Sequence, residues 1–334
     1  MLVRDFTIDK SSGVKNAGKY LGLTEKGTVN SSGVPTALDH ILDLGVTHVQ
    51  LMPVYDYSPN SVDETKLDTP QFNWGYDPYN YNVPEGSYST DPYKGEVRVN
   101  EFKQMIQSFH KNDVRVIMDV VYNHTAESAN SWMNLTVPGY YYRMNDDGSF
   151  SNGSGCGNEV ASERAMVRKY IVDSVVYWAT EYKVDGFRFD LMGLIDIETM
   201  KAVREALDKV DPTIIIYGEG WTGGTSLLLG YDAALKKNTI RFEDKQIGAF
   251  SDDIRDGLKG SVFTNTDTGF ATGKIGQEER IKAGVIGATN YPGINWAGTH
   301  TDICSPWAAN PIQTVNYTSC HDNLTLRDKI ALSN

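Results

Sequence analysis

Four short segments of the chain combine carboxylates with an arginine, a histidine or a tryptophan, a set of side chains suited to acid–base and nucleophilic chemistry. They read Asp-Val-Val-Tyr-Asn-His at 119–124, Asp-Gly-Phe-Arg-Phe-Asp at 185–190, Tyr-Gly-Glu-Gly-Trp at 217–221 and Ser-Cys-His-Asp-Asn at 319–323. In the second segment Arg188 and Asp190 are two residues apart, so both point to the same face of a strand. A cation beside Asp190 keeps this carboxylate ionised, as a nucleophile requires.

Glu219 in the third segment follows a run of apolar and small residues, 214–218. A glutamate at the rim of such a strand is partly desolvated, which raises its pKa and lets it act as an acid at neutral pH. One ionised and one protonated carboxyl, about 5 Å apart, form the pair that retaining glycoside hydrolysis uses. The alternative is a structural ion pair and a solvated strand end, but agreement among four segments favours function.

The remaining acids and histidines of these segments have other interpretations. Asp119 and Asp322, each taken alone, are more typical of a helix or turn cap. Asp119, Asn123 and His124 superficially resemble an oxygen and nitrogen metal site. A catalytic zinc needs three committed ligands, however, and the sequence has no HExxH spacing. Neutral imidazoles of His124 and His321 that donate to sugar hydroxyls fit better, so we expect no metal site and no cofactor.

The elements that must position these residues alternate between β-branched runs and helical patterns, which predicts parallel βα units. Strands are predicted at 2–6, 46–52, 114–121, 184–191, 213–218, 247–251 and 314–320. Helices are predicted at 36–44, 100–111, 163–182 and 198–210. An open doubly wound sheet and a closed (β/α)8 barrel of the TIM type both fit this order.

The connecting segments favour the barrel. Those that follow the predicted strands are long and aromatic, whereas those that precede them are short. The long ones are 53–96, 124–160, 221–245 and 251–271. Long loops at the carboxyl ends of strands are where a barrel carries its function. A nucleotide-binding sheet would need a glycine turn between a strand and a helix, and the one glycine cluster, 151–158, lies in the middle of a loop.

Composition excludes several classes of protein. The chain has 334 residues, 40% of them hydrophobic and 22% charged, which is ordinary for one large α/β domain or two smaller ones and excludes disorder. A net charge of −12 argues against nucleic-acid binding, and no apolar run approaches the roughly 20 residues that cross a bilayer. Three distant cysteines form no disulfide framework. Nineteen tyrosines and six tryptophans suit sugar-binding loops, although aromatic cores have the same count.

Taken together and in order, the four segments resemble the four signature regions of the α-amylase family of glycoside hydrolases. The residues Val-Arg-Asp-Phe at 3–6 resemble the first barrel strand of that family. The loop 72–89, which contains Asn-Trp-Gly-Tyr-Asp-Pro, resembles the marker of type I pullulanases, which cleave α-1,6 branch linkages. The resemblance extends from residue 2 to about residue 325, nearly the whole chain.

The resemblance implies a role for each matching residue. Asp190 would be the nucleophile, Glu219 the general acid/base and Asp322 the stabiliser of the transition state. The implied substrate-binding residues are Tyr76, Asp119, His124, Arg188, Trp221, His321 and Asn323. Among them Asp119 would orient Arg188, and Tyr76 would stack under the sugar at the cleaved bond, although ordinary loop packing is the alternative for Tyr76 and Trp221.

The resemblance also implies an α-glucan as the partner, and we expect a monomer that binds neither nucleic acid nor membrane. A need for calcium and the cellular compartment are left open by the sequence. Residues 1–334 are expected to form one catalytic barrel domain that is incomplete at its C-terminus, because twelve residues follow Asp322 and the eighth strand and helix are missing. The β-sandwich modules that usually precede such a barrel and the C-terminal β domain that follows it would be absent too.

Three functions remain in competition at this point. The first is an α-1,6-glucan debranching hydrolase, which the intact acids favour. The second is a catalytically inactive α-glucan-binding fragment of the same fold, which the missing strand favours. The third is a related activity of the family, such as isoamylase or α-amylase, which the loop around Asn73–Tyr79 disfavours.

Overall fold

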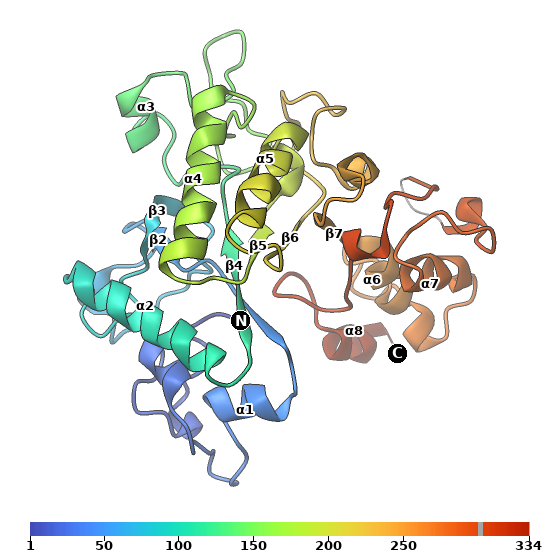
Figure 1. Cartoon of the computed structure of the whole chain (residues 1–334). Helices are drawn as coiled ribbons and strands as arrows, with labels where there is room; N and C mark the ends of the chain where they lie inside the picture. Colours follow the sequence, from blue (N-terminus) through green and yellow to red (C-terminus); the bar gives the residue numbers. More distant parts are fainter. Residues whose placement is uncertain (300–302, 334) are drawn as a thin grey trace.

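A six-stranded parallel sheet forms the centre of the protein, in the order β1-β4-β5-β6-β7-β8. The computed structural model describes residues 1–299 and 303–333. The strands of this sheet are β1 (His48–Leu51), β4 (Arg115–Val120), β5 (Gly186–Phe189), β6 (Ile215–Gly218), β7 (Gly248–Ser251) and β8 (Thr314–Asn316). The sheet curls into part of a barrel (Figure 1), and β1 and β8 are its two edges. The predicted α/β architecture is confirmed. Within the described residues no further strand joins β8 to β1, so the barrel is not closed.

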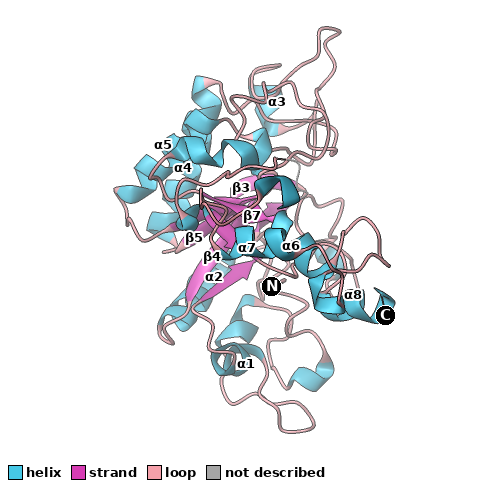
Figure 2. Ribbon diagram, turned by 90° about the vertical axis from the view of Figure 1, so that its right-hand side faces the viewer, coloured by secondary structure: helices cyan, strands magenta, loops and turns pink. Residues whose placement is uncertain are grey.

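Helices surround the strands on the outer side (Figure 2). Their bounds are α1 (Ala37–Asp43), α2 (Gly95–His110), α3 (Trp132–Thr136), α4 (Ala165–Glu181), α5 (Ile197–Asp208), α6 (Asp252–Lys259), α7 (Glu278–Val285) and α8 (Leu326–Ser333). Helices α4 and α5 lie side by side next to β4, β5 and β6, whereas α6, α7 and α8 gather near β7 and β8 (Figure 1). No helix in the described part of the chain is both long and apolar enough to cross a membrane.

The spacing of apolar residues in α4 explains how this helix attaches to the rest of the fold. Val167, Ile171, Val175 and Trp178 recur at three- or four-residue intervals and are all almost fully buried. The indole Nε1 of Trp178 donates to the backbone oxygen of Tyr81, 3.0 Å away, so the largest side chain of the stripe has its polar atom satisfied. The predicted helix at 163–182 is therefore confirmed.

The predicted strand at 2–6 is wrong. These residues form turns, in which the amide of Phe6 donates to Leu2 O and the amide of Ile8 donates to Arg4 O. Met1 alone pairs with the edge of the sheet, since its amino group lies 2.7 Å from Gln50 O and its carbonyl accepts from Met52 N at 2.9 Å. An apolar run becomes a strand only where a neighbouring strand satisfies its backbone, and here the local turn bonds do so instead.

The long segments after the strands contain more regular structure than expected. Within 53–96, β2 (Tyr55–Tyr57) pairs with β3 (Pro78–Pro84) in an antiparallel hairpin that is separate from the main sheet. Within 251–271, α6 begins directly after β7. Conversely, β8 is shorter than the predicted strand at 314–320 and ends at Asn316. Strands such as β2 and β3 pair across a long connecting segment. Such pairing produces no local periodicity in the sequence, so it could not be predicted.

Candidate active site

A cavity of about 1010 Å³ extends from the carboxyl ends of the parallel strands to β1 and the segment before it, where Val46 and His48 line it. Nearly all of the predicted site residues line it: Tyr76, His124, Arg188, Asp190, Glu219, Trp221, His321, Asp322 and Asn323. Asp119 lies beneath them and is completely buried. The cavity therefore brings together the four segments, which are separated by up to about 200 residues of sequence, as a barrel does at the carboxyl ends of its strands.

The guanidinium of Arg188 on β5 stands at the centre of the site and is only 2% exposed. Its Nη1 donates to Asp119 Oδ1 at 2.8 Å and to Asp190 Oδ1 at 2.9 Å. Its Nη2 lies 2.8 Å from Glu219 Oε1. One cation thus holds three carboxyl groups that come from β4 and from the ends of β5 and β6.

Burial dominates the proton equilibria of two of these carboxyls. It raises the pKa of Glu219 to about 8; Arg188 opposes this rise and the nearby Asp190 adds to it. Burial likewise raises the pKa of Asp119 to about 6, against the lowering effect of Arg188. A raised pKa at Glu219 is what the sequence predicts for a proton donor at neutral pH.

Asp190 is positioned by donors on both of its oxygens. Arg188 binds Oδ1, and the amide nitrogen of Asn123 donates to Oδ2 at 2.8 Å and to the backbone oxygen of Asp190 at 2.9 Å. Asn123 is fully buried, so this contact is shielded from water. Sequence analysis placed Asn123 only in a superficial metal pattern, although its position between Asp119 and His124 was a signal for a role in the site.

The residue that follows Asp190 has an unusual backbone. Leu191 has φ 39° and ψ 50°, a left-handed conformation that costs a bulky residue on the order of 1 kcal/mol. In this conformation its amide donates to Glu219 Oε2 at 2.9 Å. The strained turn therefore orients the second carboxyl oxygen of Glu219, while Arg188 holds the first.

Tyr76, from the loop before β3, connects the buried acid to the edge of the site. Its hydroxyl lies 2.6 Å from Asp119 Oδ2 and 2.9 Å from Nε2 of His321. The two rings are stacked, with centroids 5.3 Å apart and planes inclined by 19°. One face of Tyr76 is thus covered by His321.

His124 is almost fully buried, and both of its ring nitrogens face protein acceptors. Nδ1 lies 2.6 Å from Asn123 Oδ1, and Nε2 lies 2.9 Å from the backbone oxygen of Tyr76. Burial lowers the pKa of His124. A neutral imidazole has a single N–H, so His124 donates to either Tyr76 or Asn123, and a direct bond to a sugar hydroxyl stays a prediction.

Asp322 is the predicted catalytic residue that lies apart from the Arg188 cluster. Its side chain is 42% exposed, and its Oδ2 is 3.4 Å from His321 Nε2. The next residue, Asn323, is exposed and has φ 62°. Both residues lie in the segment that follows β8, an edge strand with no partner on its far side in the described chain, so less of the fold constrains them.

The rest of the cavity wall contains residues that sequence analysis did not select. Asp252 follows β7, and its carboxylate binds the ammonium of Lys236 at 2.6 Å. Arg255 donates to the hydroxyl of Tyr317 at 2.8 Å. Asp252, Arg255 and Tyr317 follow the ends of β7 and β8, and this position in the sequence was the signal that could have indicated a place in the site. Among the described residues, no group of three or more histidines, cysteines and acids is arranged to hold a metal ion.

Comparison with known proteins identifies the family. Residues 18–138 match the model of the α-amylase catalytic domain. The pullulanase of Bacillus subtilis (strain 168) is 43% identical over 332 residues, a stretch that covers 99% of this chain and 44% of that relative. The chain belongs to the α-amylase family.

Solved structures of pullulanases agree with the fold over the whole chain. The crystal structure of apo pullulanase from Paenibacillus barengoltzii is 51% identical, with a TM-score of 0.94, and the match covers 100% of this chain and 49% of that one. A second crystal structure of the same pullulanase, in complex with maltohexaose and α-cyclodextrin, has a TM-score of 0.92, 51% identity and matching coverage of 100% and 50%. The chain therefore spans about half the length of these relatives.

Proposed function

We propose that this chain carries the active site of a retaining glycoside hydrolase that cleaves α-1,6 branch linkages in pullulan, starch or glycogen-type glucans. The observation that carries the proposal is the single guanidinium, Arg188, that holds Asp190 and Glu219 together at the cavity. Two carboxyls in one site, one of them with a raised pKa, suit the two-step hydrolysis of a glycosidic bond.

In the proposed reaction, an oxygen of Asp190 attacks the anomeric carbon while the proton of Glu219 moves to the leaving glycosidic oxygen. The bond to the leaving sugar breaks and a glycosyl ester with Asp190 forms. Glu219, now ionised, then takes a proton from water as that water attacks the same carbon, which frees Asp190. Asp322 is proposed to stabilise the positive charge that develops on the sugar, and this requires its segment to close on the substrate.

The remaining residues are proposed to hold the glucan. Arg188 and His321 would hold the sugar at the cleaved bond, with Asp119 orienting Arg188, and Trp221 and Asn323 would line the neighbouring position. Tyr76, which lies between His321 and the guanidinium of Arg188, would contact the sugar ring, and His124 would fix Tyr76. Side chains supply the nucleophile and both proton transfers, so we propose no cofactor. We propose that the protein acts as a monomer on an α-glucan.

Linkage specificity is the part of the proposal that rests on the loop 72–89 and on the pullulanases that the chain resembles. Digestion of pullulan by a protein that contains this chain should release maltotriose, separable by anion-exchange chromatography. Panose, or a ladder of α-1,4 products, would contradict α-1,6 cleavage while leaving glycoside hydrolysis intact. NMR of the first product should show the retained anomeric configuration, and inversion would contradict the role of Asp190.

A second candidate function is a glucan-binding protein without turnover. The exposed position of Asp322, outside the Arg188 cluster, favours this candidate. A glucan-binding protein of this kind would bind maltohexaose and leave pullulan intact. The unaltered chain and its Glu219→Gln variant would then release product at the same background rate.

A further inference from the structure

The glycine cluster at 151–158 lies against a second segment, 222–227, that follows Trp221 at the rim of the cavity. The amide of Gly224 donates to the backbone oxygen of Gly153 at 2.8 Å. A Cβ on Gly223 would lie 2.1 Å from the backbone oxygen of Ser154, so only glycine allows this close approach. The cluster therefore serves a contact between two loops.

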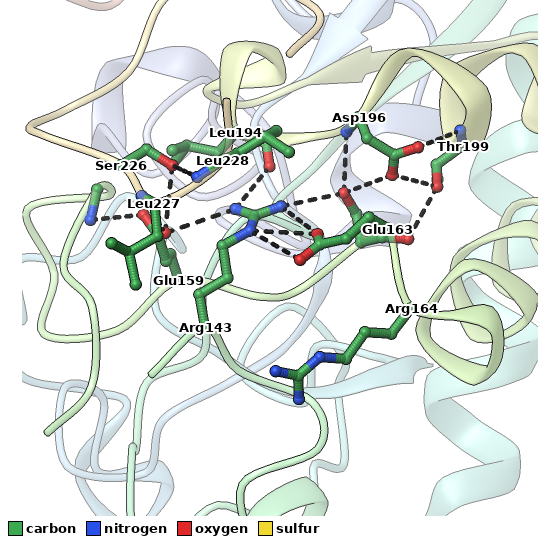
Figure 3. A network of polar contacts seen from close by, with 12 residues as sticks. Arg143, Glu159, Glu163, Arg164, Leu194, Asp196, Thr199, Ser226, Leu227 and Leu228 are labelled. Carbon is green, nitrogen blue, oxygen red and sulfur yellow. Dashed lines mark hydrogen bonds and ion pairs between the residues drawn. The ribbon is translucent and has the colours of Figure 1, made fainter. Parts of the chain in front are cut away.

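The carboxylate of Glu159 joins these two segments and is completely buried (Figure 3). Its Oε2 accepts from the amide of Gly153 at 2.8 Å. Its Oε1 accepts from the amide of Leu227 at 3.0 Å and from the hydroxyl of Ser226 at 3.2 Å. Donors from both segments thus converge on one side chain.

Arg143 compensates the buried charge of Glu159 from 3.7 Å and is itself only 4% exposed in its side chain. Its Nη1 donates to Leu194 O, in the connection between β5 and α5, at 3.1 Å, and its Nη2 binds Glu163 at 2.7 Å (Figure 3). Glu163 binds the same guanidinium but has no hydrogen bond to the segment 222–227 among the contacts of the described residues. It is half exposed in its side chain and so provides a matched control for Glu159.

We propose that Glu159 is a positioning residue that sets the rim of the cavity on which Trp221 and Thr222 lie. Trp221 lines the cavity directly before the segment 222–227, Thr222 lines it as the first residue of that segment, and Cys156 lines it from within the glycine cluster. The hydrogen bonds of Glu159 to Gly153, Leu227 and Ser226 form the tether. Without them, the contacts that still hold this stretch include the bond from Gly224 N to Gly153 O and the bond from Lys236 N to the carbonyl of Gly220, each 2.8 Å long. The assignment of an α-glucan as the ligand of this rim rests on the proposed function, whereas the structural role of Glu159 does not.

Hydrogen exchange of the 334-residue chain tests the tether without any ligand. Glu159→Gln keeps the size of the side chain but has one acceptor oxygen in place of two. It therefore cannot accept from Gly153 on one segment and from Leu227 and Ser226 on the other at the same time. We expect amide exchange over 222–228 to accelerate at least tenfold in Glu159→Gln and less than twofold in Glu163→Gln. Equal acceleration in both variants, or none in Glu159→Gln, would overturn the proposal.

Calorimetric titration with maltohexaose tests the consequence for binding. We expect affinity to fall five- to tenfold in Glu159→Gln and to stay within twofold in Glu163→Gln; unchanged affinity despite faster exchange would overturn the positioning role. If the unaltered chain does not bind maltohexaose, the proposed function fails. The hydrogen-exchange rates over 222–228 still show whether Glu159 holds that segment. Should Glu159→Gln not fold, Ser226→Ala keeps the pair of Arg143 and Glu159, and exchange over 222–228 that is no faster than in the unaltered chain would overturn the proposal.

Discussion

Glu219 Oε1 lies 2.8 Å from Arg188 Nη2, so the carboxyl proposed as the acid is bound to a cation in the unliganded site. Burial raises its pKa to about 8 in spite of this contact, because desolvation outweighs the attraction of Arg188. A substrate oxygen that receives the proton must therefore approach Glu219 beside Arg188, from the cavity side.

Substitution of either proposed catalytic carboxyl should abolish hydrolysis. In a pullulan-cleaving protein that contains this chain, Asp190→Asn and Glu219→Gln should each lower kcat by roughly three orders of magnitude or more, because both groups act in the transition state. Affinity for maltohexaose should change by less than about threefold. Reducing-sugar assays and calorimetry measure the two quantities, and a rate close to that of the unaltered protein in either variant would reject its assigned role.

Stability should fall as pH rises from about 4.5 to about 8 because of Glu219. Its pKa in the folded state, about 8, lies above the ordinary value of 4.5, so the folded protein retains a proton that the unfolded chain releases. The contribution is fully present below pH 4.5 and is lost as pH rises through 8. Urea unfolding at pH 5, 6, 7 and 8 should show a shallower decline in Glu219→Gln than in the unaltered chain; parallel declines would contradict the raised pKa.

Catalysis should fall at the alkaline end for the same reason. General-acid action by Glu219 requires its protonated form, so kcat in a protein that contains this chain should decline as pH rises through about 8. A pH–rate profile measured with saturating pullulan reports this limb. An alkaline limb that stays flat to pH 10 would contradict Glu219 as the proton donor.

Removal of the central cation should destabilise the fold. Arg188→Gln leaves Asp119 and Glu219 buried without a counter-ion, which typically costs 3–5 kcal/mol. The loss should be smaller at pH 5 than at pH 8, since Asp119 and Glu219 can take up protons at the lower pH. Lys169→Gln, which removes an exposed pair with Asp173, is the control and should cost less than about 1 kcal/mol. Equal effects of the two substitutions would contradict a buried cluster.

The 334-residue chain by itself should hydrolyse pullulan weakly or not at all. Asp322 follows the edge strand β8, and its side chain is 42% exposed. Efficient catalysis needs reacting groups placed within about 0.5 Å, which a segment beside an unpaired edge does not provide. Purified chain assayed beside its Glu219→Gln variant measures this, and substantial turnover by a cooperatively unfolding chain would refute it.

Local sequence determined which residues could do chemistry and which elements would carry them. The two-residue spacing of Arg188 and Asp190 assigns both to one face of a strand, and the apolar stripe of α4 assigns that helix to the core. Glu219 at the end of an apolar strand indicates a raised pKa, because partial burial there is already a property of the neighbouring sequence. These inferences need only the periodicity of strands and helices.

Tertiary structure alone decided which distant groups meet. Arg188 reaches Asp119, 69 residues earlier, only because β4 and β5 are neighbours in the sheet. The turn at 2–6, the exposure of Asp322 and the convergence of two loops on Glu159 depend likewise on which backbone groups find partners across the fold. Such partners are set by packing between segments far apart in the chain. Local sequence patterns describe single elements, so they do not predict which distant segments meet.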